Sequence, residues 1–243
     1  MEDIIFGRGP VFEALKNSHP IDKIIIKSGP YSKSLVPIID EAKKRGIVIR
    51  QSDEAQLSRM ARGENHQGVV AVVSAFDYVT VDDIIKRAEE KNESPFIVIC
   101  DKITDPHNLG AIIRTANCVG AHGIIIPKHD SAGVNGVVMK TSAGAVVYTP
   151  VAKVTNIASV IDELKEKGFW ITAADMDGQS MYDIDFKGSI AIVVGSEGKG
   201  VSRLVRQKCD FVASIPMCGE INSLNASVAA AVLMYEALRQ RNN

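Results

Sequence analysis

Residues 96–116 read FIVICDKITDPHNLGAIIRTA: an apolar run, a polar loop and the start of a helix in immediate succession. The run Phe96–Cys100 is short and rich in β-branched residues, which is typical of a buried strand. Asp105 before Pro106 is a favourable helix N-cap followed by a proline that the first turn tolerates. The helix is expected to leave Arg114 off its core face and to bury a stripe formed by Ile112, Ile113, Ala116 and Val119.

The same alternation of apolar runs and helical segments continues along the chain. Further runs are Gly123–Ile126, Val146–Thr149, Phe169–Ala173 and Ile190–Val194. Continuous apolar strands that alternate with helices predict an α/β fold with a mostly parallel sheet and helices on both faces. A last helix over about Leu224–Arg239 is expected to bury the stripe Leu224, Val228, Ala231, Val232, Tyr235 and Leu238.

The sequence before residue 95 predicts a second, smaller domain. We expect a small α/β domain over residues 1–75, an acidic linker over 76–94 with a helix at about Val81–Lys91, and the larger domain over 95–243. Within the small domain the expected elements are a helix opened by Pro10, a helix over Leu35–Arg45, and strands over Ile21–Lys27, Val48–Arg50 and Gly68–Ser74.

Composition excludes several classes of protein. Of the 243 residues, 46% are hydrophobic and 23% are charged, which excludes a disordered chain. No apolar run approaches the ~18 residues that a bilayer span needs, and the acidic start Met1-Glu2-Asp3 is unlike a secretory signal. The four cysteines form no C-x-x-C pair, so we expect neither a metal site nor disulfides, no membrane partner, and a cytoplasmic protein.

The charge pattern alone does not decide whether the chain binds nucleic acid. The formal net charge is −1, from 28 basic and 29 acidic residues. Basic residues still gather locally, in Lys43-Lys44-Arg45 and in the acid-free segment 199–208. Such runs are more often solvated helix faces than binding surfaces.

Three polar, glycine-bearing loops are the candidates for a functional site, because ligands of open parallel sheets bind beyond the carboxyl ends of the strands. They follow Cys100, Val194 and Ile215. In the first loop, helix capping explains Asp105 and Pro106. It does not explain His107, Asn108 and Arg114.

The second and third loops are equally unusual. VVGSEGKG at 193–200 is not a P-loop, since Val201 stands where the lysine belongs, but its glycines imply positive φ or close backbone approach to a ligand. Glu197 is unexpected in a plain turn. In IPMCGEINSLNAS at 215–227, Asn222 or Ser223 is expected to cap the last helix, which leaves Glu220 and Asn225 unexplained. Three such loops predict one site.

Taken together, the three loops resemble the motifs of the SpoU (TrmH) family of ribose 2′-O-methyltransferases, in the SPOUT class. D-x-x-x-D-P-H-N-x-G-x-x-x-R-T-A at 101–116, G-S-E-G-x-G at 195–200 and I-P-M-x-G-E-x-N-S-L-N-A-S at 215–227 are similar to its first, second and third motifs, in the same order. Gly7-Arg8-Gly9-Pro10 and Asn65-His66-Gln67-Gly68 resemble the substrate-binding domain of the 23S rRNA guanosine-2′-O-methyltransferase subfamily.

This resemblance implies a fold, a cofactor and partners. The larger domain would carry a deep trefoil knot and bind S-adenosyl-L-methionine, held by backbone groups at Gly195, Ile215 and Leu224. The small domain would have a ribosomal-protein-like RNA-binding fold. The chain would act as a homodimer on 23S rRNA or on a pre-ribosomal large-subunit particle, without a metal.

The resemblance also assigns catalytic roles. Arg114 matches the arginine proposed to activate the ribose 2′-hydroxyl, although a guanidinium is normally charged and is better suited to gripping the adjacent phosphate. Asn108, Ser223 and Asn225 would orient Arg114 and the ribose, and Glu197 would brace the cofactor loop or Arg114. His107 is a second available base.

Two alternatives stay open at this point. One is the same chemistry on a tRNA guanosine, against which the small domain argues. The other is a non-catalytic RNA-binding ribosome-assembly factor with a vestigial site, which cofactor binding would distinguish from an enzyme.

Overall fold

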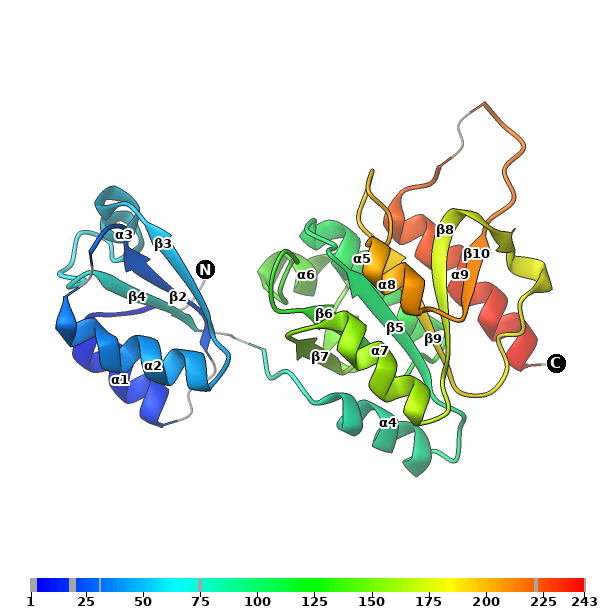
Figure 1. Ribbon diagram of the computed structural model, residues 1–243, viewed down its shortest axis with the longest axis horizontal. Coiled ribbons are helices and arrows are strands. Elements are labelled where there is room, and N and C mark those ends of the chain that lie inside the picture. Colours follow the sequence, from blue (N-terminus) through cyan, green and yellow to red (C-terminus); the bar gives the residue numbers. More distant parts are fainter. Residues whose placement is uncertain (1–3, 18–20, 31, 74–75, 221–222, 243) are drawn as a thin grey trace. The chain divides into compact units, whose positions relative to one another are not determined.

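The computed structural model describes residues 4–17, 21–30, 32–73, 76–220 and 223–242 (Figure 1). It divides into two compact units, with the boundary after Asp77. No helix within these residues is long and apolar enough to cross a bilayer.

The N-terminal unit is built on a four-stranded sheet in the order β1-β4-β2-β3, in which only the β2–β3 pair is parallel. Alternate residues of β2 face opposite sides, so Ile24 and Ile26 pack with α1 and α2 while Ile25 packs with Leu57 of α3. The elements are β1 Ile4–Phe6, α1 Arg8–Lys16, β2 Ile21–Lys27, the 3₁₀ turn η1 Lys33–Leu35, α2 Val36–Lys44, β3 Val48–Ser52, α3 Glu54–Met60 and β4 Val69–Val73.

The C-terminal unit is a six-stranded, fully parallel sheet in the order β10-β8-β9-β5-β6-β7. Helices α4, α7 and α8 cover one face, and α5 and α9 cover the other (Figure 1). The elements are α4 Val81–Glu90, β5 Phe96–Asp101, α5 Pro106–Cys118, β6 Gly123–Pro127, α6 Gly136–Thr141, η2 Ala145–Val147, β7 Val151–Val154, α7 Ile157–Glu166, β8 Trp170–Ser180, η3 Met181–Asp183, β9 Ile190–Gly195, α8 Arg203–Lys208, β10 Phe211–Ser214 and α9 Ala226–Arg241.

This sheet confirms the predicted fold class. Every residue of β5, β6 and β9 is buried, as expected for central strands covered on both faces. The predicted stripe of α5 is buried and Arg114 is exposed. The trefoil knot stays a prediction.

The prediction of a strand over Val146–Thr149 is wrong. Gly144 adopts a left-handed conformation with φ of 80° and begins the 3₁₀ turn η2, in which Val147 is 68% exposed. The strand begins only at Val151, after Pro150. A run of β-branched residues without a partner strand does not form sheet.

The segment 76–94, expected to be a linker, contributes to the C-terminal unit from Tyr78 onward. Thr80 and Asp83 form a capping box that begins α4. Ile84 of this helix is fully buried and lies over Gly123, where a Cβ atom would come within 2.7 Å of its side chain. The helix has an acidic face and an apolar face, and the apolar face packs on the sheet.

The predicted stripe of the last helix is also wrong. The side chains of α9 that are buried are Ala226, Ala230, Leu233, Met234, Glu236 and Ala237. Val228 is 46% exposed and Tyr235 is 53% exposed. The helix is apolar on most of its surface, and its alanine-rich face packs against the sheet, so apolar spacing could not identify the buried side.

Candidate functional site

A cavity of about 750 Å³ lies at the carboxyl ends of β9 and β10, beside the middle of β8. It is walled by residues 174–177, 194–198 and 213–217, by Gly200, and by the segment that leads into α9. Its volume falls in the range typical of small-molecule sites. The position agrees with the rule that ligands bind beyond the carboxyl ends of parallel strands.

The glycine-rich loop forms a closed turn beside this cavity. The Ser196 amide donates to the Gly200 carbonyl at 3.1 Å, and the Gly200 amide donates to the Ser196 carbonyl at 2.9 Å. Gly195 lies so close to this turn that a Cβ atom would be 1.9 Å from the carbonyl carbon of Gly200. The expected close backbone approach is therefore between Gly195 and Gly200 of the same loop. The glycines of this loop line the cavity with backbone.

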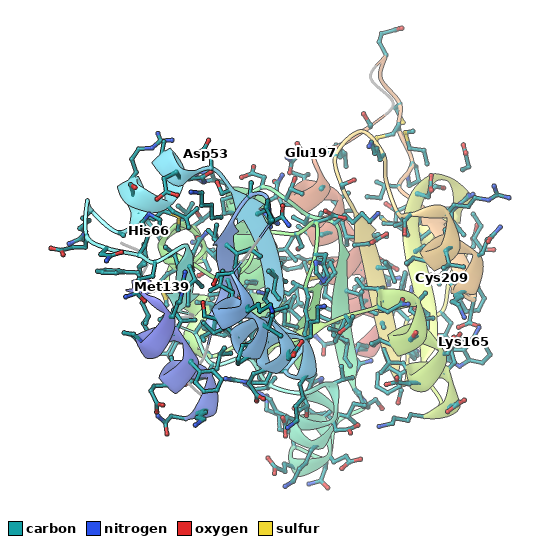
Figure 2. The ribbon with its side chains drawn as sticks, turned by 60° about the vertical axis from the view of Figure 1, so that its left-hand side comes forward. Asp53, His66, Met139, Lys165, Glu197 and Cys209 are labelled. Atoms are coloured by element: carbon teal, nitrogen blue, oxygen red, sulfur yellow. The ribbon has the colours of Figure 1, made fainter. Side chains whose placement is uncertain are left out.

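Glu197 joins the three loops predicted to form one site. It follows β9, at the end of the sheet toward which the strand arrows point (Figure 2). Its Oε1 accepts hydrogen bonds from Nδ2 of Asn108, at 2.8 Å, and from Nδ2 of Asn225. Asn108 is buried in the first turn of α5, whereas Asn225 begins α9. One carboxylate thus fixes two amides from distant segments of the chain.

Asn225 has a second role, which corrects the expected helix cap. Its Oδ1 accepts from the amides of Ser227, at 2.9 Å, and Val228, at 3.3 Å, so Asn225 caps α9. Ser223 lies two residues before this cap and lines the cavity. Asn222 lies outside the described residues.

Arg114 and Ser223 keep their polar groups available for a ligand. Both are exposed, and neither forms a hydrogen bond or ion pair with a described residue. Ile215 and Leu224 line the cavity, together with the backbone of Gly195. Six of the eight predicted site residues therefore lie at the cavity wall: Gly195, Glu197, Ile215, Ser223, Leu224 and Asn225. Asn108 is tied to this wall through its hydrogen bond to Glu197. Arg114 forms no hydrogen bond or ion pair with this cluster within the described residues.

The first loop begins as the sequence predicts. Oδ1 of Asp105 accepts from the amide of His107 at 2.9 Å, and Pro106 occupies the first turn of α5. The Nδ1 atom of His107 lies 3.3 Å from the hydroxyl of Thr141 in α6. His107 thus has a partner within the fold, whereas Arg114 has none among the residues that the structure describes.

Sequence reasoning missed two parts of the site. Asp101 is 3% exposed, and its Oδ2 accepts from the amide of Ser202 at 2.7 Å, which fastens the end of β5 to the start of α8. Residues 174–177 of β8 form one cavity wall. The signal for both was the end of a buried strand, but the strand predicted over Phe169–Ala173 stopped short of that wall.

The chemistry of the cysteines differs from that of the site. Burial raises the pKa of the Cys100 and Cys209 thiols to about 12, so both stay protonated and unreactive. Within the described part of the chain, no three His, Cys, Asp or Glu residues lie close enough together to hold a metal ion.

Two family models match the chain, and their boundaries follow its two units. The SpoU rRNA Methylase family matches residues 95–235. A model described as RNA 2′-O ribose methyltransferase substrate binding matches residues 4–79.

Curated relatives match along the whole length. A protein of Bacillus subtilis assigned to the TrmH family of tRNA/rRNA methyltransferases, YacO, is 46% identical, with 99% of this chain and 96% of the relative covered. A protein of Staphylococcus aureus assigned to the same family is 43% identical, with 100% and 98% covered.

Solved structures of the same family have a similar fold. The SpoU methyltransferase AviRb of Streptomyces viridochromogenes, in complex with the cofactor AdoMet, matches with a TM-score of 0.62 and 28% identity, over 98% of this chain and 90% of that chain. The TrmH/SpoU tRNA modifying enzyme of A. aeolicus matches with a TM-score of 0.57 and 32% identity, over 66% of this chain and 84% of that one. Because the methylase model spans more than half of the chain and close relatives span nearly all of it, the chain belongs to the SpoU rRNA methylase family.

Proposed function

We propose that this chain, an S-adenosyl-L-methionine-dependent RNA methyltransferase, methylates a ribose 2′-hydroxyl, and that its target is a guanosine of 23S rRNA. The observation that carries the proposal is the Glu197 carboxylate, which ties all three motif loops together beside a cavity of cofactor size. A vestigial site would have no need to keep this arrangement.

The cavity fits the cofactor. Its volume of about 750 Å³ suits a nucleoside with an amino-acid tail, and its walls combine apolar side chains with backbone polar groups at Gly195 and Ile215. These backbone groups and Leu224 would hold the adenosine and methionine parts. When bound, the cofactor supplies a methyl group activated by a sulfonium charge.

Positioning is the main task left to the protein. The free guanidinium of Arg114 would grip the phosphate next to the target ribose with two N–H groups and thereby fix the 2′-oxygen. The hydroxyl of Ser223 would orient the ribose. Asn108 and Asn225, held by Glu197, would keep α5 and the start of α9 in register. Arg114 would take part in removing the hydroxyl proton only to the extent that its charge is reduced.

The N-terminal unit supports ribosomal RNA over tRNA as the target. It matches a substrate-binding domain of 2′-O ribose methyltransferases. The A. aeolicus tRNA modifying enzyme matches only 66% of this chain, about the share that the C-terminal unit alone represents. The N-terminal unit would then serve to recognise a larger RNA or a pre-ribosomal particle.

The exposed face of α9 supports a homodimer. Val228 and Tyr235 are seven residues apart in α9, which places them on the same side of the helix, and they are 46% and 53% exposed. An apolar stripe of this kind is typical of a subunit interface. Replacing Tyr235 by Glu should shift the protein toward monomer in analytical ultracentrifugation.

The test is transfer of labelled methyl from S-adenosyl-L-methionine to unmodified 23S rRNA, with tRNA in parallel. Label in 23S rRNA that makes the labelled position resistant to alkali establishes ribosomal ribose methylation. Label in tRNA alone overturns the target but keeps the chemistry. Absence of both label and cofactor binding favours the assembly-factor alternative.

A further inference from the structure

A second cavity of about 820 Å³ adjoins the cofactor cavity. The two share Asp175, Ser196 and Gly200 as lining residues. Four cations line the second cavity, which we call the basic cavity: Lys102, Lys199, Arg203 and Arg206. None of these four residues belongs to the predicted cofactor or catalytic residues.

The charges of the basic cavity are largely uncompensated. Asp175 is the one acidic residue in its lining and lies 3.2 Å from Nε of Arg206. That Nε atom is buried and makes no hydrogen bond with a described residue. Lys102, Lys199 and Arg203 form no ion pair within the described residues. The lining therefore carries about three positive charges in excess, which repel one another unless an anion binds.

The backbone positions of three of these residues are constrained. Lys102 has a left-handed conformation with φ of 60°, unusual for a lysine, directly after Asp101, whose carboxylate is fixed by the Ser202 amide. Lys199 lies in the turn closed by the Ser196–Gly200 hydrogen bonds, and Arg203 begins α8. Segments following β5 and β9 thus converge on one side of the cofactor cavity.

We propose that the basic cavity binds the phosphodiester backbone of the RNA substrate next to the nucleotide that is methylated. The proposal rests on the proposed function, since it takes RNA to be the substrate. Several cations around one cavity suit a chain of phosphates, and the shared wall puts them beside the cofactor cavity. The competing ligand is the carboxylate of the cofactor itself.

The test is a triple variant, Lys102→Asn, Lys199→Gln and Arg203→Gln. Asparagine is chosen at 102 because it tolerates a positive φ better than most residues. RNA affinity is measured against salt concentration, and cofactor affinity by calorimetry. Each lost phosphate contact on a single strand lowers the slope of log affinity against log salt by about 0.7, so we expect a slope shallower by about 2. Cofactor affinity should change by less than about twofold, with KM for RNA raised more than kcat is lowered.

A matched control removes three charges elsewhere in the same unit: Lys86→Gln, Lys91→Gln and Lys187→Gln, all exposed and outside the basic cavity. An equal loss of slope in this control overturns the proposal in favour of a general charge effect. A fall in cofactor affinity with an unchanged slope overturns it in favour of the cofactor carboxylate.

Two further outcomes separate this proposal from the proposed function. If the wild type binds RNA but transfers no methyl group, a shallower slope in the triple variant still supports the basic cavity while the proposed function fails. If the wild type methylates RNA and the triple variant keeps its slope, only the basic cavity is overturned. Should the triple variant fail to fold, Arg203→Gln alone, at an exposed position, should lower the slope by about 0.7.

Discussion

The two edges of the C-terminal sheet use similar polar residues in opposite ways. At the amino edge, a cavity of about 540 Å³ is lined by Glu93, His122 and Arg241 among others. His122 is 1% exposed, and both ring nitrogens have partners: the Phe96 amide donates to Nδ1 at 3.0 Å, and Nε2 lies 2.9 Å from Oε2 of Glu93. Arg241 donates to the carbonyls of Gly188, at 2.6 Å, and Ser94.

At the carboxyl edge, some polar side chains have donors or acceptors without a partner among the described residues. Lys199 and Ser223 have no polar partner among the described residues, although Glu197, Asn108 and Asn225 of the same loops are joined by hydrogen bonds. A polar group whose partners are all internal stabilises the fold, because leaving it unpaired would be costly. A group positioned by such neighbours but left free is available to a ligand. The predictions below test this division of roles.

The largest effect is expected from Gly195→Ala at the carboxyl edge. The new Cβ atom would lie 1.9 Å from the backbone of Gly200, so the closed turn must open. We expect loss of cofactor binding and a fall in the free energy of unfolding of about 4 kcal/mol or more. Calorimetry with S-adenosyl-L-methionine and urea unfolding measure the two effects.

Gly219→Ala is the control for this variant. Gly219 belongs to the third loop, but a Cβ atom there meets nothing within 4 Å. It should bind cofactor and unfold as the wild type does. If both substitutions reduce cofactor binding and stability equally, the loops tolerate no substitution of glycine by alanine. The close approach of Gly195 to Gly200 would then not explain the effect.

Next in size is the effect of replacing Glu197. Glu197→Ala removes the acceptor shared by Asn108 and Asn225, and we expect methyl transfer to fall by about 10²–10³-fold. Glu197→Gln keeps an oxygen that can accept both hydrogen bonds and should lose about 10-fold or less. If the two variants are equally inactive, the negative charge matters more than the bracing, and the structural role argued here for Glu197 is wrong.

These two sites also show what the sequence could and could not predict. The glycines at 195, 198 and 200 predicted a constrained turn, and Asp105-Pro106 predicted the start of α5. Both predictions succeed because they depend on neighbouring residues alone. The Glu197–Asn108 bond joins residues 89 positions apart, and no spacing rule predicts it. The motif resemblance predicted that these residues belong to one site, whereas only the structure showed which of them form hydrogen bonds with each other.

The fold shows the same limit. Buried strands such as β5 and β9 were predictable from continuous apolar runs. The buried side of α9 was not, because Val228 and Tyr235 are as apolar as the residues that face the sheet. The sequence predicts an acidic linker over 76–94 with a helix at about Val81–Lys91, and that helix is found as α4, but its buried Ile84 and Ala88 make it part of the C-terminal unit. The buried face of a helix cannot be predicted from its sequence where more than one of its faces can pack against a neighbouring element.

A third prediction concerns stability at the amino edge. Arg241→Ala removes a charged donor from two carbonyls and a guanidinium stacked 5.6 Å from the Phe96 ring centroid. We expect the free energy of unfolding to fall by about 1.5–3 kcal/mol with kcat unchanged below the unfolding temperature. Lys86→Ala, which removes an exposed ion pair with Glu90 one turn along α4, is the control and should cost less. A loss of turnover in folded Arg241→Ala would contradict the separation of the two edges.

The smallest expected effect is a pH dependence set by His122. Burial lowers the pKa of its imidazole, opposed by the hydrogen bond and charge of Glu93 and reinforced by Lys91 and Arg241. The unfolded chain, in which histidine keeps its ordinary pKa near 6.5, therefore binds more protons than the folded chain just below that pH. The free energy of unfolding should accordingly fall as the pH drops from about 7 to about 5.5. His122→Asn, which keeps an acceptor for the Phe96 amide but cannot be protonated, should reduce this fall in urea titrations. If His122→Asn keeps the whole pH dependence, the proton responsible binds elsewhere, and His122 is a fully compensated structural group at every pH tested.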